Sequence, residues 1–137
     1  MREKINSQYS DLVAEGYDMS SIVFENIEEV WPDILIDEVY SFKLGNVEFK
    51  LIPTPGHTPS NIVVYLPPYK VLFAGDTIYS GYPPNTKLST PELVEKWIKA
   101  LDLPYNLDIE IIIPGHGPPC NKEEIRRNRA LLMRIKK

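Results

Sequence analysis

The sequence predicts an α/β protein built on one mixed β-sheet, with helices covering one face of that sheet. Three observations lead to this prediction. Apolar residues recur at helical spacing near both ends of the chain, five short runs between residues 39 and 113 have strand character, and a helical segment separates the fourth run from the fifth. The predicted order is α-α-β-β-β-β-α-β-α, and 137 residues with 43% hydrophobic composition fit a single domain, residues 1–137.

Two amphipathic helices are expected at the start of the chain. Residues 1–15 carry an apolar stripe and precede Gly16, a residue typical of helix ends. Residues 18–31 repeat the pattern and stop before Pro32. The apolar positions that define the two stripes are Ile5, Tyr9, Leu12, Val13, Ile22, Val23, Ile27, Val30 and Trp31.

The period then changes to that of strands. Alternating residues on both sides of Gly45-Asn46 predict a two-residue hairpin over residues 39–51. Residues 61–66 and 70–74 form a second strand pair around Pro67-Pro68-Tyr69. Because both of these runs are apolar on each face, they are expected to lie centrally in the sheet.

The last part of the chain predicts two helices around a strand. Thr90 and Pro91 supply an N-cap and a first-turn proline for a helix that ends near Leu101, and residues 109–113 read as the final strand. Asn121 and Glu124 resemble a capping pair for a closing helix. The two tryptophans, Trp31 and Trp97, sit at helical spacing with other apolar residues and are expected to be core anchors.

Composition excludes several classes of function. A net charge of −4 and a pI near 5.2 argue against binding to nucleic acid or to an anionic membrane, both of which require a basic face. An acidic segment at residues 18–40 and a basic one at 122–137 are either solvated helix faces or surfaces that meet. A lone cysteine, Cys120, and the absence of a signal-peptide or membrane-spanning pattern predict a reducing, cytoplasmic setting.

Three similar segments carry the candidate chemistry. His57 and His116, the only histidines, each follow a glycine after an apolar run, and Asp76 has the same setting. Glycine before such a residue permits a sharp turn and a close backbone approach. Residues at strand ends gather at one edge of a sheet, so a convergent His/Asp/His site of the kind that binds metals is expected. Turn capping by Thr58 and Thr77 is an alternative explanation of these loops.

Three motifs in this order resemble the downstream motifs of the metallo-β-lactamase superfamily. They are Thr54-Pro-Gly-His57-Thr-Pro-Ser-Asn-Ile, Phe73-Ala-Gly-Asp76-Thr and Ile113-Pro-Gly-His116-Gly-Pro, and they lie within residues 47–133. The resemblance is to the C-terminal half of that family's αββα sandwich. It implies that His57 belongs to a first metal position, that His116 belongs to a second, and that Asp76 bridges the two. It also implies a metal-dependent hydrolase of ester, thioester, lactone, lactam or phosphoester bonds.

The chain departs from that pattern at one decisive place. The family's upstream His-x-His-x-Asp-His motif supplies the other ligands and an acid/base aspartate, and no histidine precedes His57 here. Zinc or a similar divalent metal is therefore expected to bind weakly or partially, and catalysis by the lone chain is expected to be impaired. Whether the chain is an enzyme and which catalytic and substrate-binding residues it would use stay open at this point.

A half sandwich would also leave one apolar sheet face uncovered. Two partners are considered for this face. One is a second copy of the chain, giving a homodimer that is a noncatalytic binding or structural remnant. The other is a separate chain corresponding to the missing N-terminal half, which would complete a split hydrolase.

Overall fold

The computed structural model describes residues 30–87 and 89–135. Two units make up the chain, residues 1–34 and 35–137, and every element given below belongs to the second. The helix predicted at residues 1–15 lies outside the described residues, as does most of the one predicted at 18–31. Val30 and Trp31, at the end of that second helix, are not helical, and Trp31 is 71% exposed instead of anchoring a core.

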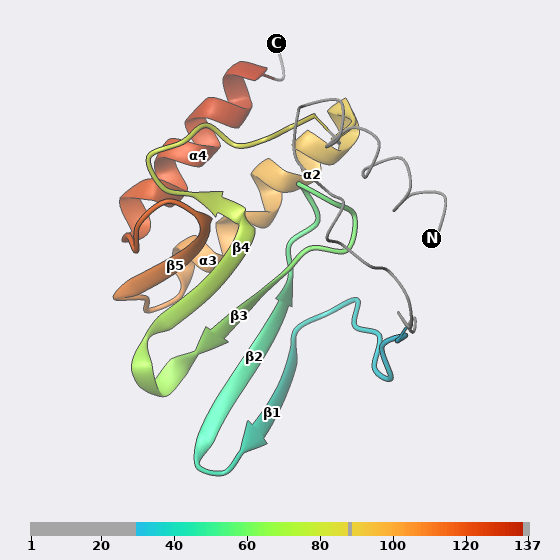
Figure 1. Cartoon of the computed structure of the whole chain (residues 1–137), viewed down its shortest axis with the longest axis vertical. Coiled ribbons are helices and arrows are strands. Elements are labelled where there is room, and N and C mark those ends of the chain that lie inside the picture. The colour runs from blue at the N-terminus through green and yellow to red at the C-terminus, as the bar shows by residue number, and fades with distance from the viewer. Residues whose placement is uncertain (1–29, 88, 136–137) are drawn as a thin grey trace, which may run out of the picture. The chain divides into compact units, whose positions relative to one another are not determined.

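Five strands form one mixed sheet in the order β1-β2-β3-β4-β5 (Figure 1). The strands are β1 (Tyr40–Leu44), β2 (Val47–Pro53), β3 (Ile62–Leu66), β4 (Val71–Tyr79) and β5 (Ile111–His116). The first three pairings are antiparallel, whereas β4 and β5 are parallel. The C-terminal ends of β2, β4 and β5 therefore reach the same edge of the sheet. This confirms the predicted mixed sheet, the hairpin and the central strand pair.

The helical elements are the 3₁₀ turn η1 (Pro67–Tyr69) and the helices α2 (Pro91–Ala100), α3 (Asp102–Asn106) and α4 (Lys122–Ile135). The predicted N-cap of α2 is present, and so is the Asn121 cap of α4, whereas the Glu124 side chain of the predicted capping pair bonds to Arg127 instead. The Thr90 side chain accepts a hydrogen bond from the Leu93 N–H, and the Asn121 side chain accepts one from the Glu123 N–H at 2.9 Å. These short-range bonds fix where the two helices begin. Trp97, on α2, is fully buried as predicted.

One face of the sheet is covered by these helices, and we call it the covered face. Its central residues, including Val63, Leu72 and Ile112, have no exposed surface and pack with Trp97 of α2 and Leu132 of α4. In Figure 1 the helices lie over the β3 to β5 side of the sheet, and the β1–β2 hairpin extends away from them. Accordingly, the covered-face residues where β1 pairs with β2 are polar: Ser41, Lys43, Glu48 and Lys50. Ile52, further along β2 and opposite Val63, is buried.

The opposite face, called the open face below, is apolar or aromatic across all five strands. Strand register places on it Tyr40, Phe42, Leu44, Val47, Phe49, Leu51, Pro53, Ile62, Val64, Leu66, Val71, Phe73, Ile111 and Ile113. None of the helices described by the structure covers these residues. Ile62, Phe73 and Ile111 are 40%, 45% and 47% exposed.

Three features differ from the prediction. β4 continues past a register shift at Gly75 to Tyr79, so Asp76 lies inside a strand and not in a loop after it. β5 begins two residues later than predicted and extends to His116, and the short helix α3 was not predicted. None of the helices in the described part of the chain has the length and apolar character needed to cross a bilayer.

Candidate metal centre

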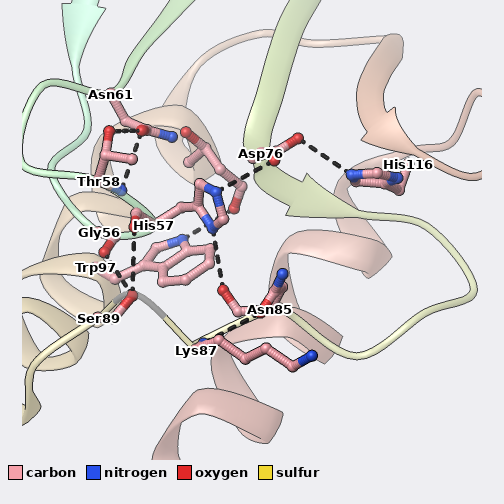
Figure 2. A network of polar contacts seen from close by, with 11 residues as sticks. Gly56, His57, Thr58, Asn61, Asp76, Asn85, Lys87, Ser89, Trp97 and His116 are labelled. Atoms are coloured by element: carbon pink, nitrogen blue, oxygen red, sulfur yellow. Dashed lines mark hydrogen bonds and ion pairs between the residues drawn. The ribbon is translucent and has the colours of Figure 1, made fainter. Parts of the chain in front are cut away.

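His57, Asp76 and His116 meet at the sheet edge where β2, β4 and β5 end. Figure 2 shows the Asp76 carboxylate between the two imidazoles. The His57 Nε2 atom lies 3.3 Å from Asp76 Oδ2, and the His116 Nε2 atom lies 3.6 Å from Asp76 Oδ1. Each carboxylate oxygen thus faces a different histidine.

Glycine permits this convergence at two of the three positions. A Cβ atom on Gly115 would lie 2.1 Å from Asp76 Oδ1, so any side chain there would displace the carboxylate. On Gly56 it would lie 2.3 Å from the Trp97 ring, the group that supports the loop before His57. The close approach expected of these glycines is therefore real, and each serves a different neighbour.

The tautomer of His57 follows from its other ring nitrogen. Nδ1 lies 3.0 Å from the backbone oxygen of Asn85 (Figure 2), and because a carbonyl only accepts, Nδ1 must carry the proton and donate. A neutral His57 then presents an Nε2 lone pair to the Asp76 carboxylate, which would repel it. Two states relieve this conflict: a doubly protonated imidazole, or a cation that binds both atoms.

The turn-cap alternative holds in part. The Thr58 N–H and hydroxyl both bond to the Asn61 side chain, which closes the loop after His57. Thr77 instead is buried, and its hydroxyl pairs with that of Thr54 at 2.9 Å. These bonds shape the loops without using the histidines or Asp76, so capping and a functional role of the three side chains are compatible.

Distances decide how a metal would fit. In tetrahedral zinc sites with ligand bonds of about 2.0–2.2 Å, two adjacent ligand atoms lie about 3.3–3.6 Å apart. The two His–Asp separations fall within this range, so each pair fits one metal position and Asp76 would be shared between both. Among the described residues, however, no three His, Cys, Asp or Glu side chains group around a single ion position. Each position would therefore have two ligands from this part of the chain, fewer than the three or four that protein zinc sites use.

Tyr79 and Asn85 complete the surroundings of the site, and neither was singled out as functional from the sequence. Together with Tyr82, Pro83, His116 and Gly117 they line a surface cavity of about 400 Å³. The Tyr79 ring stacks on His116 with 5.0 Å between ring centroids, and burial, followed by the negative charge of Asp76, raises the pKa of Tyr79 to about 12. Asn85 meets His57 across 28 residues of sequence, so no local pattern could have revealed it.

The segment from Tyr79 to Lys87 borders the site. The residues between Tyr79 and Lys87 contribute four of the cavity-lining side chains, while Lys87 itself bonds through its backbone N–H to Asn85. A cavity of this size next to His116 can admit a small substrate.

Comparison with known proteins gives a consistent result. The family model of the metallo-beta-lactamase superfamily matches residues 20–116. A type 2 metallo-beta-lactamase from Bacillus sp. (strain 170) is 32% identical over 90 residues, which are 64% of this chain and 35% of that protein. The hydroxyacylglutathione hydrolase GloC of Haemophilus influenzae is 36% identical over 95 residues, 67% of this chain and 44% of that protein.

Solved structures agree on the fold. A metallo-beta-lactamase from Pontibacter korlensis superposes with a TM-score of 0.66 at 22% identity, over 91% of this chain and 62% of that one. The chain spans less than half the length of the two sequence relatives.

Proposed function

Because the chain belongs to the metallo-beta-lactamase superfamily, we propose that it forms one half of a metal-dependent hydrolase, with Asp76 bridging two metal positions. One position would be shared with His57 and the other with His116. The observation that carries this proposal is the pair of separations, 3.3 and 3.6 Å, by which the two Asp76 oxygens face the two Nε2 atoms. A single His–Asp hydrogen bond would not require both oxygens to be used in this way.

Each residue would have a distinct task. Asp76 would contribute one oxygen to each position, and the Asn85 carbonyl would hold the His57 ring with Nε2 directed inward. When bound, divalent ions such as zinc supply Lewis acidity toward the carbonyl of an ester, thioester, lactone or lactam. The cavity beside His116 would receive that substrate.

Two ligands per position are too few for a strong site, so we infer that the lone chain binds metal weakly and hydrolyses poorly. The missing ligands would come from a protein segment that packs on the open face. This face fits such a partner because it is apolar throughout and ends at the edge where the three side chains lie. The sequence relatives, more than twice as long as their matched part, are consistent with a further half.

A homodimer without catalytic activity is the second candidate, and the open face favours it as well. Two copies could stack these faces as two sheets do in a sandwich, with no ligand added to either site. The two candidates differ in their metal ligands. A homodimer would add no ligand to either site, whereas a complementary segment would supply the missing ones.

Metal binding by purified chain tests the main proposal. The chain would be stripped with a chelator, and zinc affinity measured by competition with a chromogenic indicator for the unsubstituted protein, Asp76→Asn and Asp108→Asn. Asp108 is a matched control, since it is an exposed carboxylate that pairs with Lys70 away from the site. Asp76→Asn should weaken zinc binding by roughly tenfold or more, because it removes the shared charged ligand, whereas Asp108→Asn should not.

Equal zinc affinity of Asp76→Asn and the unsubstituted chain would reject the metal centre. Hydrolysis assays with a chromogenic lactam and a thioester, at saturating zinc, test the impairment separately. Turnover of either substrate by the lone chain well above that of Asp76→Asn would show that no further half is needed.

A further inference from the structure

Tyr79 occupies a fixed place behind the candidate metal centre. It ends β4, and Asn128 of α4 holds its backbone at both polar groups: the Tyr79 N–H donates to Asn128 Oδ1 at 2.9 Å, and the Tyr79 carbonyl accepts from Asn128 Nδ2 at 2.7 Å. Asn128 is itself fully buried and donates to the Glu124 carbonyl as well. The backbone of Tyr79 is therefore held by the helix layer.

The Tyr79 ring contacts both imidazoles of the site. It stacks on His116 with an interplanar angle of 11°, and its centroid lies 6.4 Å from that of His57 at a tilt of 58°. A buried aromatic ring in this place keeps the two histidines from rotating away from Asp76. A phenylalanine would provide the same contacts, so the ring alone does not account for a tyrosine.

The hydroxyl is the part that remains unexplained. Tyr79 is 4% exposed, and its hydroxyl oxygen is the one buried side-chain polar atom of the described residues without a hydrogen-bond partner. Leaving a buried donor unpaired costs about 1–3 kcal/mol. Besides burial, which has the largest effect, the groups close enough to affect the pKa of this hydroxyl are the Asp76 carboxylate, through its charge and as an acceptor, and the backbone of Asn85.

Asp76 has acceptor capacity to spare for this donor. A carboxylate offers about four lone-pair sites, and the two imidazoles face one on each oxygen. On its other side, the carboxylate packs against the backbone at Gly115, where no Cβ would fit. The carboxylate therefore has little room to move on that side, and it lies near enough to the hydroxyl that, after burial, its charge and its acceptor oxygens raise the pKa of Tyr79.

We propose that Tyr79 is a positioning residue of the metal centre, whose hydroxyl donates a hydrogen bond to Asp76 when the carboxylate engages a cation and so keeps one oxygen directed at each histidine. This inference rests on the metal site proposed above. It assigns the hydroxyl a function that the ring does not have. The ring of Tyr79 lines the cavity, whereas its hydroxyl is buried behind the site, so the hydroxyl would act through Asp76 and not on the substrate.

The test compares Tyr79→Phe with Tyr69→Phe. The second variant removes the same atom from an exposed tyrosine in η1. Zinc affinity would be measured by indicator competition, cobalt binding by its visible absorption spectrum, and the stability of the metal-free chain by thermal unfolding. Loss of a hydrogen bond to a metal ligand typically lowers metal affinity by about 10–100-fold, so Tyr79→Phe should weaken zinc binding by at least about tenfold and alter the cobalt spectrum. Tyr69→Phe should change neither.

Stability separates this role from a structural one. Since the metal-free chain leaves the Tyr79 hydroxyl unpaired, Tyr79→Phe should be as stable as the unsubstituted chain or more so, while its zinc affinity falls. Unchanged zinc affinity and an unchanged cobalt spectrum, in a chain where Asp76→Asn does lose zinc, would overturn the role of Tyr79 and leave the metal site standing. A metal-free Tyr79→Phe chain that is clearly less stable would also overturn it, because the hydroxyl would then be a structural group. Equal zinc binding by Asp76→Asn and the unsubstituted chain would instead remove the site on which the inference rests.

Discussion

The two faces of the sheet are equally apolar around β3, β4 and β5 but differ in what packs on them. Leu72 and Phe73, neighbours in β4, show the difference: Leu72 is completely buried under the helices, whereas Phe73 on the open face keeps almost half of its surface exposed. This difference within one strand shows that the apolar character of a residue does not determine whether another part of the same chain packs on it. Within residues 30–87 and 89–135, helices cover the sheet on one side only.

The candidate metal centre reflects the same asymmetry. Two of its supports come from the helix side and from the loop before α2: Trp97 contacts His57 edge to face at 6.0 Å, and the Ser89 hydroxyl bonds to the Gly56 carbonyl at 3.0 Å. From the open side, none of the described residues contributes a further ligand. Covering the open face and completing the site are therefore linked in the function that we propose.

Truncating Leu72 and Phe73 to alanine should test the difference between the two sheet faces most clearly. Leu72→Ala leaves a cavity under the helices and should lower the free energy of unfolding by about 2–5 kcal/mol. Phe73→Ala should cost about 1 kcal/mol or less in a chain whose open face is uncovered, because little buried surface is lost. Urea unfolding of both variants measures the difference. Equal losses would mean that the open face is already packed in the isolated chain.

A charge on the open face should reveal any association through it. Phe73→Lys would place an ammonium group inside the contact and should weaken self-association or partner binding by about 10–100-fold. Sedimentation equilibrium over a range of concentrations gives the self-association constant. Ser41→Lys is the control, since Ser41 lies on the polar, covered-face side of β1. A chain that is monomeric at micromolar concentration before substitution would exclude the homodimer.

A smaller effect concerns the helix layer itself. The Thr90 side chain caps α2 through the Leu93 N–H, and Thr90→Ala should lower the free energy of unfolding by about 1 kcal/mol. Thr90→Ser keeps the accepting oxygen and should retain most of that stability. Thermal unfolding compares the two variants. A full loss in Thr90→Ser would show that the methyl group, and not the cap, stabilises this end of the helix.

The elements predicted well from the sequence are those with short-range signals. The hairpin at Gly45, the strand pair around η1 and the cap of α2 each depend on residues a few positions apart. α3 escaped prediction because it is only five residues long and contains Pro104. The extension of β4 was missed because Gly75, which permits a register shift inside the strand, resembles the end of a strand in sequence.

The candidate site was predicted to a similar extent. The meeting of His57, Asp76 and His116 followed from their place after apolar runs. Their metal-binding role stays a prediction. What the sequence did not reveal is the way Asp76 divides its oxygens between the two histidines, the bond from His57 to Asn85 and the buried hydroxyl of Tyr79. These depend on contacts between residues far apart in sequence, which only the folded chain brings together.

The polar residues on the covered-face side of the β1–β2 hairpin have a consequence for how the chain folds. Since none of the helices that the structure describes lies on that side, the hairpin is held by its pairing to β3 and by aromatic contacts such as Phe42 on Phe49, whose ring centroids are 5.1 Å apart. It should therefore open locally far more often than β4, and its amide hydrogens should exchange with solvent by brief excursions that leave the helix layer intact. Slower hydrogen exchange of the β1 and β2 amides would then indicate that a partner has bound to the open face.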